Sequence, residues 1–305
     1  MNMFPSKILL FGEYTVLLGS DALTTPYEEY SGRLAFLNDE RKFQHEQVIQ
    51  SNRTIAKFLK YLSMPAPSVK DPGLDLNALT SELKKGLYFN SNIPQGSGLG
   101  SSGALIAALF HRYGPNRKEY PENIENLQKE LASLEDYFHG TSSGIDPLIS
   151  YIKRPVYIGN NGHTQPWIHP LKSVLKNYGM FLVQSAAIRN TKKMVTSFLK
   201  HCKTDNRYVN TLRQYYTPVS NACIRSLHTG GFMDHMRVLS GLQLKLFQRM
   251  FTPDMGIHIK NGLQSEMFYL KLCGAGGGGH YLGFTENIKA TETYFRANNM
   301  KFNYF

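Results

Sequence analysis

Hydrophobic and polar positions along the chain predict a succession of strands and helices. Short apolar or β-branched stretches predict strands, and apolar residues recurring every three or four positions predict helices. The predicted strands are Arg33–Leu37, Gly86–Asn92, Val156–Ile158, Met180–Gln184, Phe268–Cys273 and Tyr281–Phe284. The predicted helices are Thr54–Leu62, Ala104–Tyr113, one opened by Pro121, Arg207–Leu227, Phe232–Met250, and a last one before Lys301–Phe305.

Two further segments shape the expected organisation. The start, Lys7–Gly19, is interpreted as two short strands about a bend at Gly12 and Glu13. The hydrophilic stretch Pro170–Lys176 is the candidate domain boundary, which divides the chain into domains of residues 1–172 and 173–305.

Two of the helices carry information about burial. Ala104–Tyr113 is almost wholly apolar and must be buried on all sides, and Gly114-Pro115 stops it. In the helix opened by Pro121, Glu135 lies roughly 60° from the centre of the apolar stripe at 100° per residue. A carboxylate that flanks a buried face needs a partner.

Composition narrows the class of protein. The chain has 305 residues, of which 42% are hydrophobic, and this excludes wholesale disorder. No apolar run approaches the roughly 18 residues that span a bilayer. The run Ile8–Phe11 is shorter than the core of a signal peptide, so we expect a cytoplasmic protein. The three widely spaced cysteines predict neither a disulfide framework nor a zinc site.

The charge balance points to anionic partners. The formal net charge is +11, which favours nucleic acid, a membrane surface, or phosphorylated and carboxylated small molecules. The chain has no block of basic residues; the densest basic patch is the pair Lys192–Lys193. We therefore expect small-molecule substrates rather than nucleic acid or membrane.

Three glycine-rich segments, Gly96–Gly103, Gly140–Gly144 and Gly274–Gly279, interrupt the pattern. The first runs directly into the buried helix, where consecutive backbone N–H groups form a site for phosphate. The hydroxyls of Ser101 and Ser102 could bind phosphate or magnesium. A flexible turn with a serine cap explains only part of this composition. A dinucleotide fingerprint also fits poorly, because Gly114, Pro115 and Pro121 interrupt the path to a second strand. The pattern of the phosphate-loop NTPases fails because no lysine follows the last glycine.

The first glycine segment, from Pro94 to Ser102, resembles the P-x-x-x-G-L-G-S-S-A motif of the GHMP kinases, with Gly103 in place of the usual alanine. Four more segments resemble this family, in its order along the chain. They are Phe4-Pro5-Ser6-Lys7 with Gly12-Glu13-Tyr14, Ser142-Ser143-Gly144-Ile145-Asp146, Arg189-Asn190-Thr191, and Lys271-Leu272-Cys273-Gly274-Ala275-Gly276-Gly277-Gly278-Gly279. The resemblance therefore runs from Lys7 to about Phe284.

The resemblance implies an α+β fold in two domains: an N-terminal ATP-binding domain and a ferredoxin-like C-terminal domain, with the substrate in the cleft between them. It implies ATP and Mg²⁺ as cofactors. It makes Asp146 the general base, with Lys7 beside it to hold the carboxylate ionised and stabilise developing charge. It assigns Ser102 and Glu135 to Mg²⁺. On its own residues, Gly-Ile-Asp146-Pro is equally well a turn.

The remaining expected site residues also come from the resemblance. Those expected to bind the ATP phosphates are Pro94, Gly96, Ser97, Gly98, Leu99, Gly100, Ser101 and Ser102. Those expected at the substrate are Lys7, Glu13, Tyr14, Asp146, Arg189 and Thr191, and the C-terminal glycine loop contributes Gly274, Ala275, Gly276 and Gly277. Such a loop is unfavourable to order, so a close approach to a ligand or to the first loop explains it best.

Within the family, the chain is most similar to mevalonate kinases. Glu135, the S-G-x-D segment and Arg189-Asn190-Thr191 favour that assignment, whereas Tyr14 and Gly103 resemble phosphomevalonate kinases. Phosphomevalonate kinase, another sugar or metabolite kinase, and a catalytically idle nucleotide or metabolite sensor are the alternatives. The sequence leaves the oligomeric state open, a homodimer included.

Overall fold

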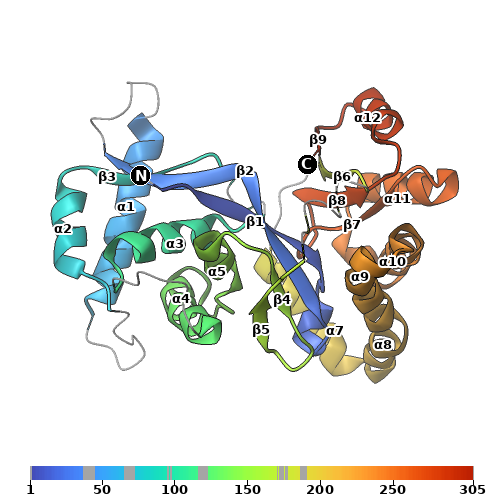
Figure 1. Cartoon of the computed structure of the whole chain (residues 1–305), viewed down its shortest axis with the longest axis horizontal. Coiled ribbons are helices and arrows are strands. Elements are labelled where there is room, and N and C mark those ends of the chain that lie inside the picture. The colour runs from blue at the N-terminus through green and yellow to red at the C-terminus, as the bar shows by residue number, and fades with distance from the viewer. Residues whose placement is uncertain are drawn as a thin grey trace. The chain divides into compact units, whose positions relative to one another are not determined.

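The structure is a computed structural model that describes residues 2–36, 45–64, 73–94, 96, 98–115, 123–169, 171, 175, 178–185 and 191–304. The chain forms two compact units, each assembled from separate segments. The first unit consists of Met1–Lys7, Thr25–Pro94 and Leu99–Arg154. The second unit consists of Ile8–Thr24, Gln95–Gly98 and Pro155–Phe305. Figure 1 shows the elements of each unit.

Strands β1 (Phe4–Phe11) and β2 (Ala22–Phe36) belong to one sheet, in which the order is β1-β2-β4-β5 and β3 also pairs with β2. In the first unit, Gly32–Phe36 of β2 pair antiparallel with β3 (Leu87–Ser91). In the second unit, Ala22–Thr24 pair with β4 (Val156–Ile158), which pairs in turn with β5 (Thr164–Pro166). The predicted strand Arg33–Leu37 is thus the last part of a longer strand.

The helices of the first unit place its chemical groups. They are α1 (His45–Leu62), α2 (Leu76–Lys84), α3 (Ser101–Tyr113), α4 (Ile124–His139) and α5 (Ile145–Ile152). Helix α3 packs against both α4 and α5 (Figure 1). Its residues from Gly103 to Phe110 are buried, as the apolar sequence predicts, whereas His111 and Arg112 in its last turn are exposed. The contact with α5 is close: a Cβ at Gly103 would lie 2.7 Å from the carbonyl carbon of Asp146, so only glycine fits there without a shift.

The second unit contains an antiparallel sheet in the order β7-β8-β6-β9. Its strands are β6 (Met180–Gln184), β7 (Tyr269–Leu272), β8 (His280–Phe284) and β9 (Phe302–Tyr304). Helices α7 (Thr191–Thr204), α8 (Asn206–Thr211), α9 (Thr217–Thr229), α10 (Phe232–Leu246) and α11 (Pro253–Ser265) lie between β6 and β7 in sequence, and α12 (Ile288–Ala297) lies between β8 and β9. This βαββαβ arrangement confirms the expected ferredoxin-like part of the fold.

Two predicted elements differ in the structure. The second strand predicted in Lys7–Gly19 is wrong: the chain turns at Gly12 (φ +102°) and forms a short 3₁₀ helix, Thr15–Leu18, which Gly19 ends in a left-handed conformation. The helix predicted over Arg207–Leu227 contains a π-helical turn, Leu212–Tyr216, between α8 and α9. A periodicity of apolar residues does not reveal either change, because both depend on local hydrogen bonding.

Other boundaries shift by a few residues. Helix α1 begins nine residues before the predicted Thr54. Helix α4 begins at Ile124, where the Asn123 side chain accepts a hydrogen bond from the backbone N–H of Asn126, and Pro121 lies outside the described residues. The predicted domain boundary at residues 172 and 173 also falls on residues that the structure does not describe, and it stays a prediction.

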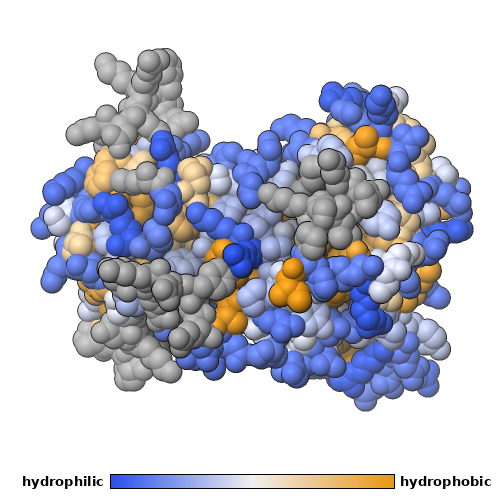
Figure 2. Space-filling view, viewed as in Figure 1, coloured by the Kyte–Doolittle hydropathy of each residue, from blue (hydrophilic) through white to orange (hydrophobic). Residues whose placement is uncertain are grey.

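On the face seen in Figure 2, hydrophilic residues dominate the coloured surface and apolar residues gather in small separate groups. Ile168 is the most exposed of the large apolar side chains in the described ranges, at 86%. None of the described helices is long and apolar enough to cross a membrane.

Candidate active site

The first unit brings Lys7 and Asp146 together. Lys7 is the last residue of the first unit's share of β1, and its backbone N–H donates to the carbonyl of Leu99 at 2.9 Å. Asp146 lies in the first turn of α5. The N-cap residue of this helix is Gly144, which has a left-handed conformation with φ +72°. Lys7 Nζ lies 2.8 Å from Asp146 Oδ1, and the two side chains are 14% and 31% exposed. The carboxylate therefore has a cationic partner and a favourable helix N-terminus while remaining accessible.

The end of the first glycine segment lies next to this pair. Gly100 caps the N-terminus of α3 in the left-handed conformation, with φ +78°. A Cβ at Gly100 would lie 3.0 Å from Lys7 Cγ and 3.4 Å from Asp146 Oδ2. The backbone thus approaches both side chains closely, and the N–H groups at the start of α3, which have no partner within the helix, form a suitable place for an anion.

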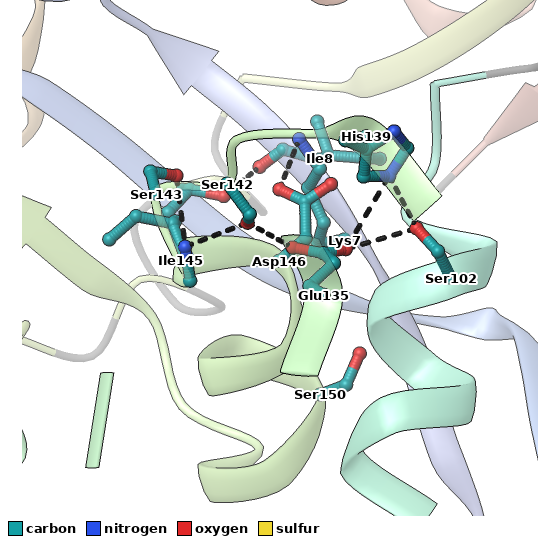
Figure 3. A network of polar contacts seen from close by, with 12 residues as sticks. Lys7, Ile8, Ser102, Glu135, His139, Ser142, Ser143, Ile145, Asp146 and Ser150 are labelled. Carbon is teal, nitrogen blue, oxygen red and sulfur yellow. Dashed lines mark hydrogen bonds and ion pairs between the residues drawn. The ribbon is translucent and has the colours of Figure 1, made fainter. Parts of the chain in front are cut away.

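A second carboxylate, that of Glu135, lies in a network of hydroxyl groups (Figure 3). Ser102 Oγ, at the start of α3, donates to Glu135 Oε1 at 3.0 Å, and Ser142 Oγ donates to Oε2 at 2.5 Å. His139, the last residue of α4, places Nε2 2.9 Å from Ser102 Oγ and 3.8 Å from Glu135 Oε1. Ser102 and Glu135, which the resemblance assigns to Mg²⁺, are therefore neighbours, and their role at a metal stays a prediction.

Within the part of the chain that the structure describes, the Glu135 carboxylate forms no ion pair with a lysine or an arginine. Burial raises the pKa of Glu135 to about 7, and the nearby charge of Asp146 adds to this rise; the hydroxyls of Ser142 and Ser102 and the charge of Lys7 oppose it. A bound divalent cation would relieve the cost of ionising this group. A carboxylate oxygen and a hydroxyl oxygen are also the donor types that Mg²⁺ prefers. The oxygens of Ser102 and Glu135 therefore fit a magnesium ion.

Glu13 and Asp146 are both expected at the substrate, but they belong to different units. Glu13 belongs to the second unit, is 1% exposed, and forms an ion pair with the fully buried Lys271 of β7. Gln243 of α10 donates to Glu13 Oε2 at 3.5 Å and to the hydroxyl of Tyr216 at 2.7 Å. Burial raises the pKa of Glu13, and the charge of Lys271 opposes that rise. This arrangement holds Glu13 in the core of its unit.

Tyr14 connects the N-terminal turn with the C-terminal glycine loop. Its hydroxyl donates to the carbonyl of Ala275, and its ring lies 4.6 Å from that of Phe198, centroid to centroid. The loop is itself closely packed: the backbone N–H of Gly277 donates to the carbonyl of Met250 at 2.6 Å, and a Cβ at Gly276 would lie 2.4 Å from the same oxygen. Close approach of backbone to backbone thus explains the glycine at position 276.

Several expected residues cannot be placed at the site. Ser97 and Arg189 lie outside the described residues, and Thr191 is described only as the first residue of α7. Gly96 and Gly98 have φ of +71° and +79° and belong to the second unit. The assignment of all of these residues to ATP or substrate stays a prediction.

Sequence reasoning missed two members of the network. Ser142 is the first residue of the family-like segment that ends at Asp146. Nothing else in the sequence indicates its hydrogen bond with Glu135. His139 was not among the expected site residues; its spacing of four residues from Glu135, which puts both on one helix face, was the available signal.

Comparisons with known proteins agree with this fold. Residues 55–153 match the GHMP kinases N terminal domain. A mevalonate kinase of Archaeoglobus fulgidus is 25% identical over 291 residues, which cover 93% of this chain and 92% of that one. A mevalonate kinase of Dictyostelium discoideum is 24% identical over 249 residues, and the match spans 70% of this chain but only 60% of that protein.

The structure of L. major mevalonate kinase in complex with R-mevalonate superposes with a TM-score of 0.67 at 16% identity, covering 97% of this chain and 90% of that one. This likeness extends the shared α+β fold over nearly the whole chain. The likeness to the GHMP kinases thus consists of the N-terminal domain match over residues 55–153 and of relatives at about 25% identity. The relatives named above are mevalonate kinases, and the phosphomevalonate kinase of Streptococcus pneumoniae also superposes, with a TM-score of 0.63 at 15% identity, covering 100% of this chain and 99% of that one.

Proposed function

We propose that this chain is an ATP- and Mg²⁺-dependent small-molecule kinase that transfers the γ-phosphoryl group to the primary hydroxyl of mevalonate. The observation that carries the proposal is the accessible pair of Lys7 and Asp146, 2.8 Å apart, next to the capped N-terminus of α3. A base, a cation and a helix N-terminus are the parts that phosphoryl transfer to an alcohol requires.

In this proposal Asp146 accepts the proton of the substrate hydroxyl. Lys7 engages Oδ1, and Oδ2 faces Gly100, so Oδ2 is the oxygen assigned to that proton. The substrate oxygen then forms a bond to the γ-phosphorus while the bond to the bridging oxygen breaks and ADP leaves. The ammonium of Lys7 stabilises the negative charge that develops on the transferred group.

The residues assigned to hold Mg²⁺ are Ser102 and Glu135, whose oxygens lie 3.0 Å apart. When bound, the ion supplies neutralisation of charge on the phosphate oxygens. The packing of Gly103 against Asp146 supports the same arrangement, since it fixes the base relative to the start of α3.

The choice of acceptor rests on charge. Mevalonate offers one carboxylate, whereas phosphomevalonate adds a dianionic phosphate and calls for further cations. Arg189 is the only arginine in the family-like segments, and the turn around Tyr14 supplies no second cation. We therefore assign Arg189 and Thr191 to the carboxylate of mevalonate. The whole-chain relatives that act on mevalonate by name support the same choice.

The test is a coupled assay that measures ADP release with mevalonate, phosphomevalonate, galactose or homoserine as the acceptor. We expect mevalonate to be preferred in kcat/KM by at least ~10²-fold, about 2.7 kcal/mol of transition-state binding. Arg189→Ala should mainly raise the KM for mevalonate. Equal turnover of phosphomevalonate would contradict mevalonate as the preferred acceptor, but the protein would still be a kinase. Absence of ADP release with every acceptor, alongside tight ATP binding, would favour a nucleotide sensor.

A further inference from the structure

The hydroxyl of Ser102 lies between two different neighbours. Ser102 Oγ is 3.0 Å from Glu135 Oε1 and 2.9 Å from His139 Nε2 (Figure 3). A serine hydroxyl has a single hydrogen and two lone pairs, so it donates to one neighbour at a time. An ionised carboxylate can only accept, whereas a neutral imidazole nitrogen donates or accepts according to its tautomer.

These rules allow two arrangements of hydrogens. In the first, Ser102 donates to Glu135, and His139 carries its hydrogen on Nε2 and donates to Ser102. In the second, His139 carries its hydrogen on Nδ1, and Ser102 donates to Nε2. The lone pairs of Ser102 Oγ and of Glu135 Oε1 then face one another at 3.0 Å, an arrangement that is repulsive unless a cation lies against both oxygens.

We propose that His139 is a positioning residue for the metal: it accepts the hydrogen of Ser102 and thereby frees a lone pair of Ser102 Oγ for a divalent cation shared with Glu135. The inference rests on the proposed function, because it takes the metal site of that function as given. It goes beyond it by assigning a role to a histidine that the reaction itself does not need.

The placement of His139 suits this role. His139 and Glu135 lie four residues apart on α4, so one rigid helix sets both groups against the start of α3. Gly140, with φ +82°, ends the helix directly after the histidine. The imidazole is 53% exposed, so its replacement leaves no cavity in the core. Loss of its acceptor would leave the Ser102 hydrogen directed at Glu135, in competition with the cation.

The experiment measures binding of Mn²⁺ in the presence of ADP, by the loss of the free Mn²⁺ signal in electron paramagnetic resonance. Mn²⁺ takes the same oxygen ligands as Mg²⁺. His139→Leu should raise the Kd for Mn²⁺ by ~10-fold, within the range found when a partner of a metal ligand is removed. His139→Gln, which keeps an acceptor near the position of Nε2, should stay within about threefold of the parent.

The double variant separates positioning from direct ligation. If His139 acts through Ser102, Ser102→Ala with His139→Leu should bind Mn²⁺ no more weakly than Ser102→Ala alone, because the interaction is already lost. The matched control is His201→Gln, which removes a histidine that also lies four residues from an acid, Asp205, on the surface of the second unit. Its Kd should equal that of the parent.

Three outcomes overturn the inference. An unchanged Kd in His139→Leu, with the parent binding Mn²⁺ and turning over mevalonate, removes the role of His139 and leaves the proposed function standing. Additive effects in the double variant make His139 an independent ligand. Absence of Mn²⁺ binding by the parent with ADP overturns both the inference and the proposed metal site.

Discussion

Two lysine–carboxylate pairs in this protein differ in their burial. The pair of Lys7 and Asp146 in the first unit is partly open, with 14% and 31% of the side chains exposed. The pair of Lys271 and Glu13 in the second unit has no exposed side-chain surface. Both lysines belong to family-like segments, and sequence reasoning gave Lys7 and Glu13 a place in the same site.

The difference in burial distinguishes an ion pair that can take part in a reaction from one that serves the structure. An open pair can exchange a partner with substrate and change its protonation during a reaction. In the buried pair, Lys271 also donates to the carbonyl of Leu272, and Glu13 also accepts from Gln243. This pair therefore connects β7 with the N-terminal turn. A buried ion pair of this kind gives little net stability, but removal of one partner is severely unfavourable, because the other charge is left in the core.

The largest effect expected is on stability at the closed pair. Lys271→Met should lower the free energy of unfolding by about 3–5 kcal/mol, since it leaves the Glu13 carboxylate buried without its partner. Urea denaturation followed by circular dichroism measures the change. The double variant Glu13→Gln with Lys271→Met should be more stable than Lys271→Met alone. A double variant that is less stable still would show that the charge is not the cause.

At the open pair the same substitution should affect turnover instead. Lys7→Met should lower kcat by ~10²-fold or more, as when a group that stabilises developing charge is removed. Because the pair is partly exposed, the free energy of unfolding should fall by no more than about 1 kcal/mol. Steady-state ADP release and urea denaturation are measured on the same preparation. A loss of stability equal to that of Lys271→Met would erase the distinction between the pairs.

Glu135 is intermediate between the two cases, because it is buried but contacts hydroxyls rather than a lysine. Glu135→Gln should raise the Mg²⁺ concentration that gives half-maximal rate by ~10-fold, since it removes the charge of a proposed metal ligand. Asp75→Asn is a suitable control, because asparagine also caps helix α2. Identical Mg²⁺ dependence in the parent and in Glu135→Gln would place the metal elsewhere.

The smallest effect concerns pH. Burial raises the pKa of Glu135 from 4.5 to about 7, so the folded protein retains a proton that the unfolded chain has released. This contribution to stability is complete below about pH 4.5 and is lost as the pH rises through about 7. Without added metal, the parent should therefore lose Tm relative to Glu135→Gln between pH 5 and pH 8. A Tm difference that does not change with pH would contradict the assignment.

Much of the fold could be predicted from the sequence, because apolar runs and glycine segments mark strands, buried helices and turns. Ala104–Tyr113 and Val156–Ile158 illustrate this. The bend at Gly12 could be predicted, but the 3₁₀ helix Thr15–Leu18 after it could not. The positive φ of Tyr14 that precedes this helix goes with packing of its ring on Phe198 and a hydrogen bond to Ala275, which are contacts with distant parts of the sequence.

The candidate site was predictable only in part. The glycine at position 103 and the acid at position 146 were visible as separate motifs, but their contact follows from the packing of α3 on α5. The pairing of Glu13 with Lys271 joins residues 258 positions apart, and no local pattern could reveal it. Long-range contacts between polar groups are the part that a single sequence does not determine.

Mevalonate-dependent release of ADP by the parent and by Asp146→Asn tests the central claim most directly. The substitution keeps the size of the side chain and removes its capacity to accept a proton. We predict that the variant folds and binds ATP like the parent, and that its kcat is at least ~10²-fold lower, the lower range for a positioned general base. Near-normal kcat in the folded variant would contradict the account, because Asp146 would then have no part in the reaction.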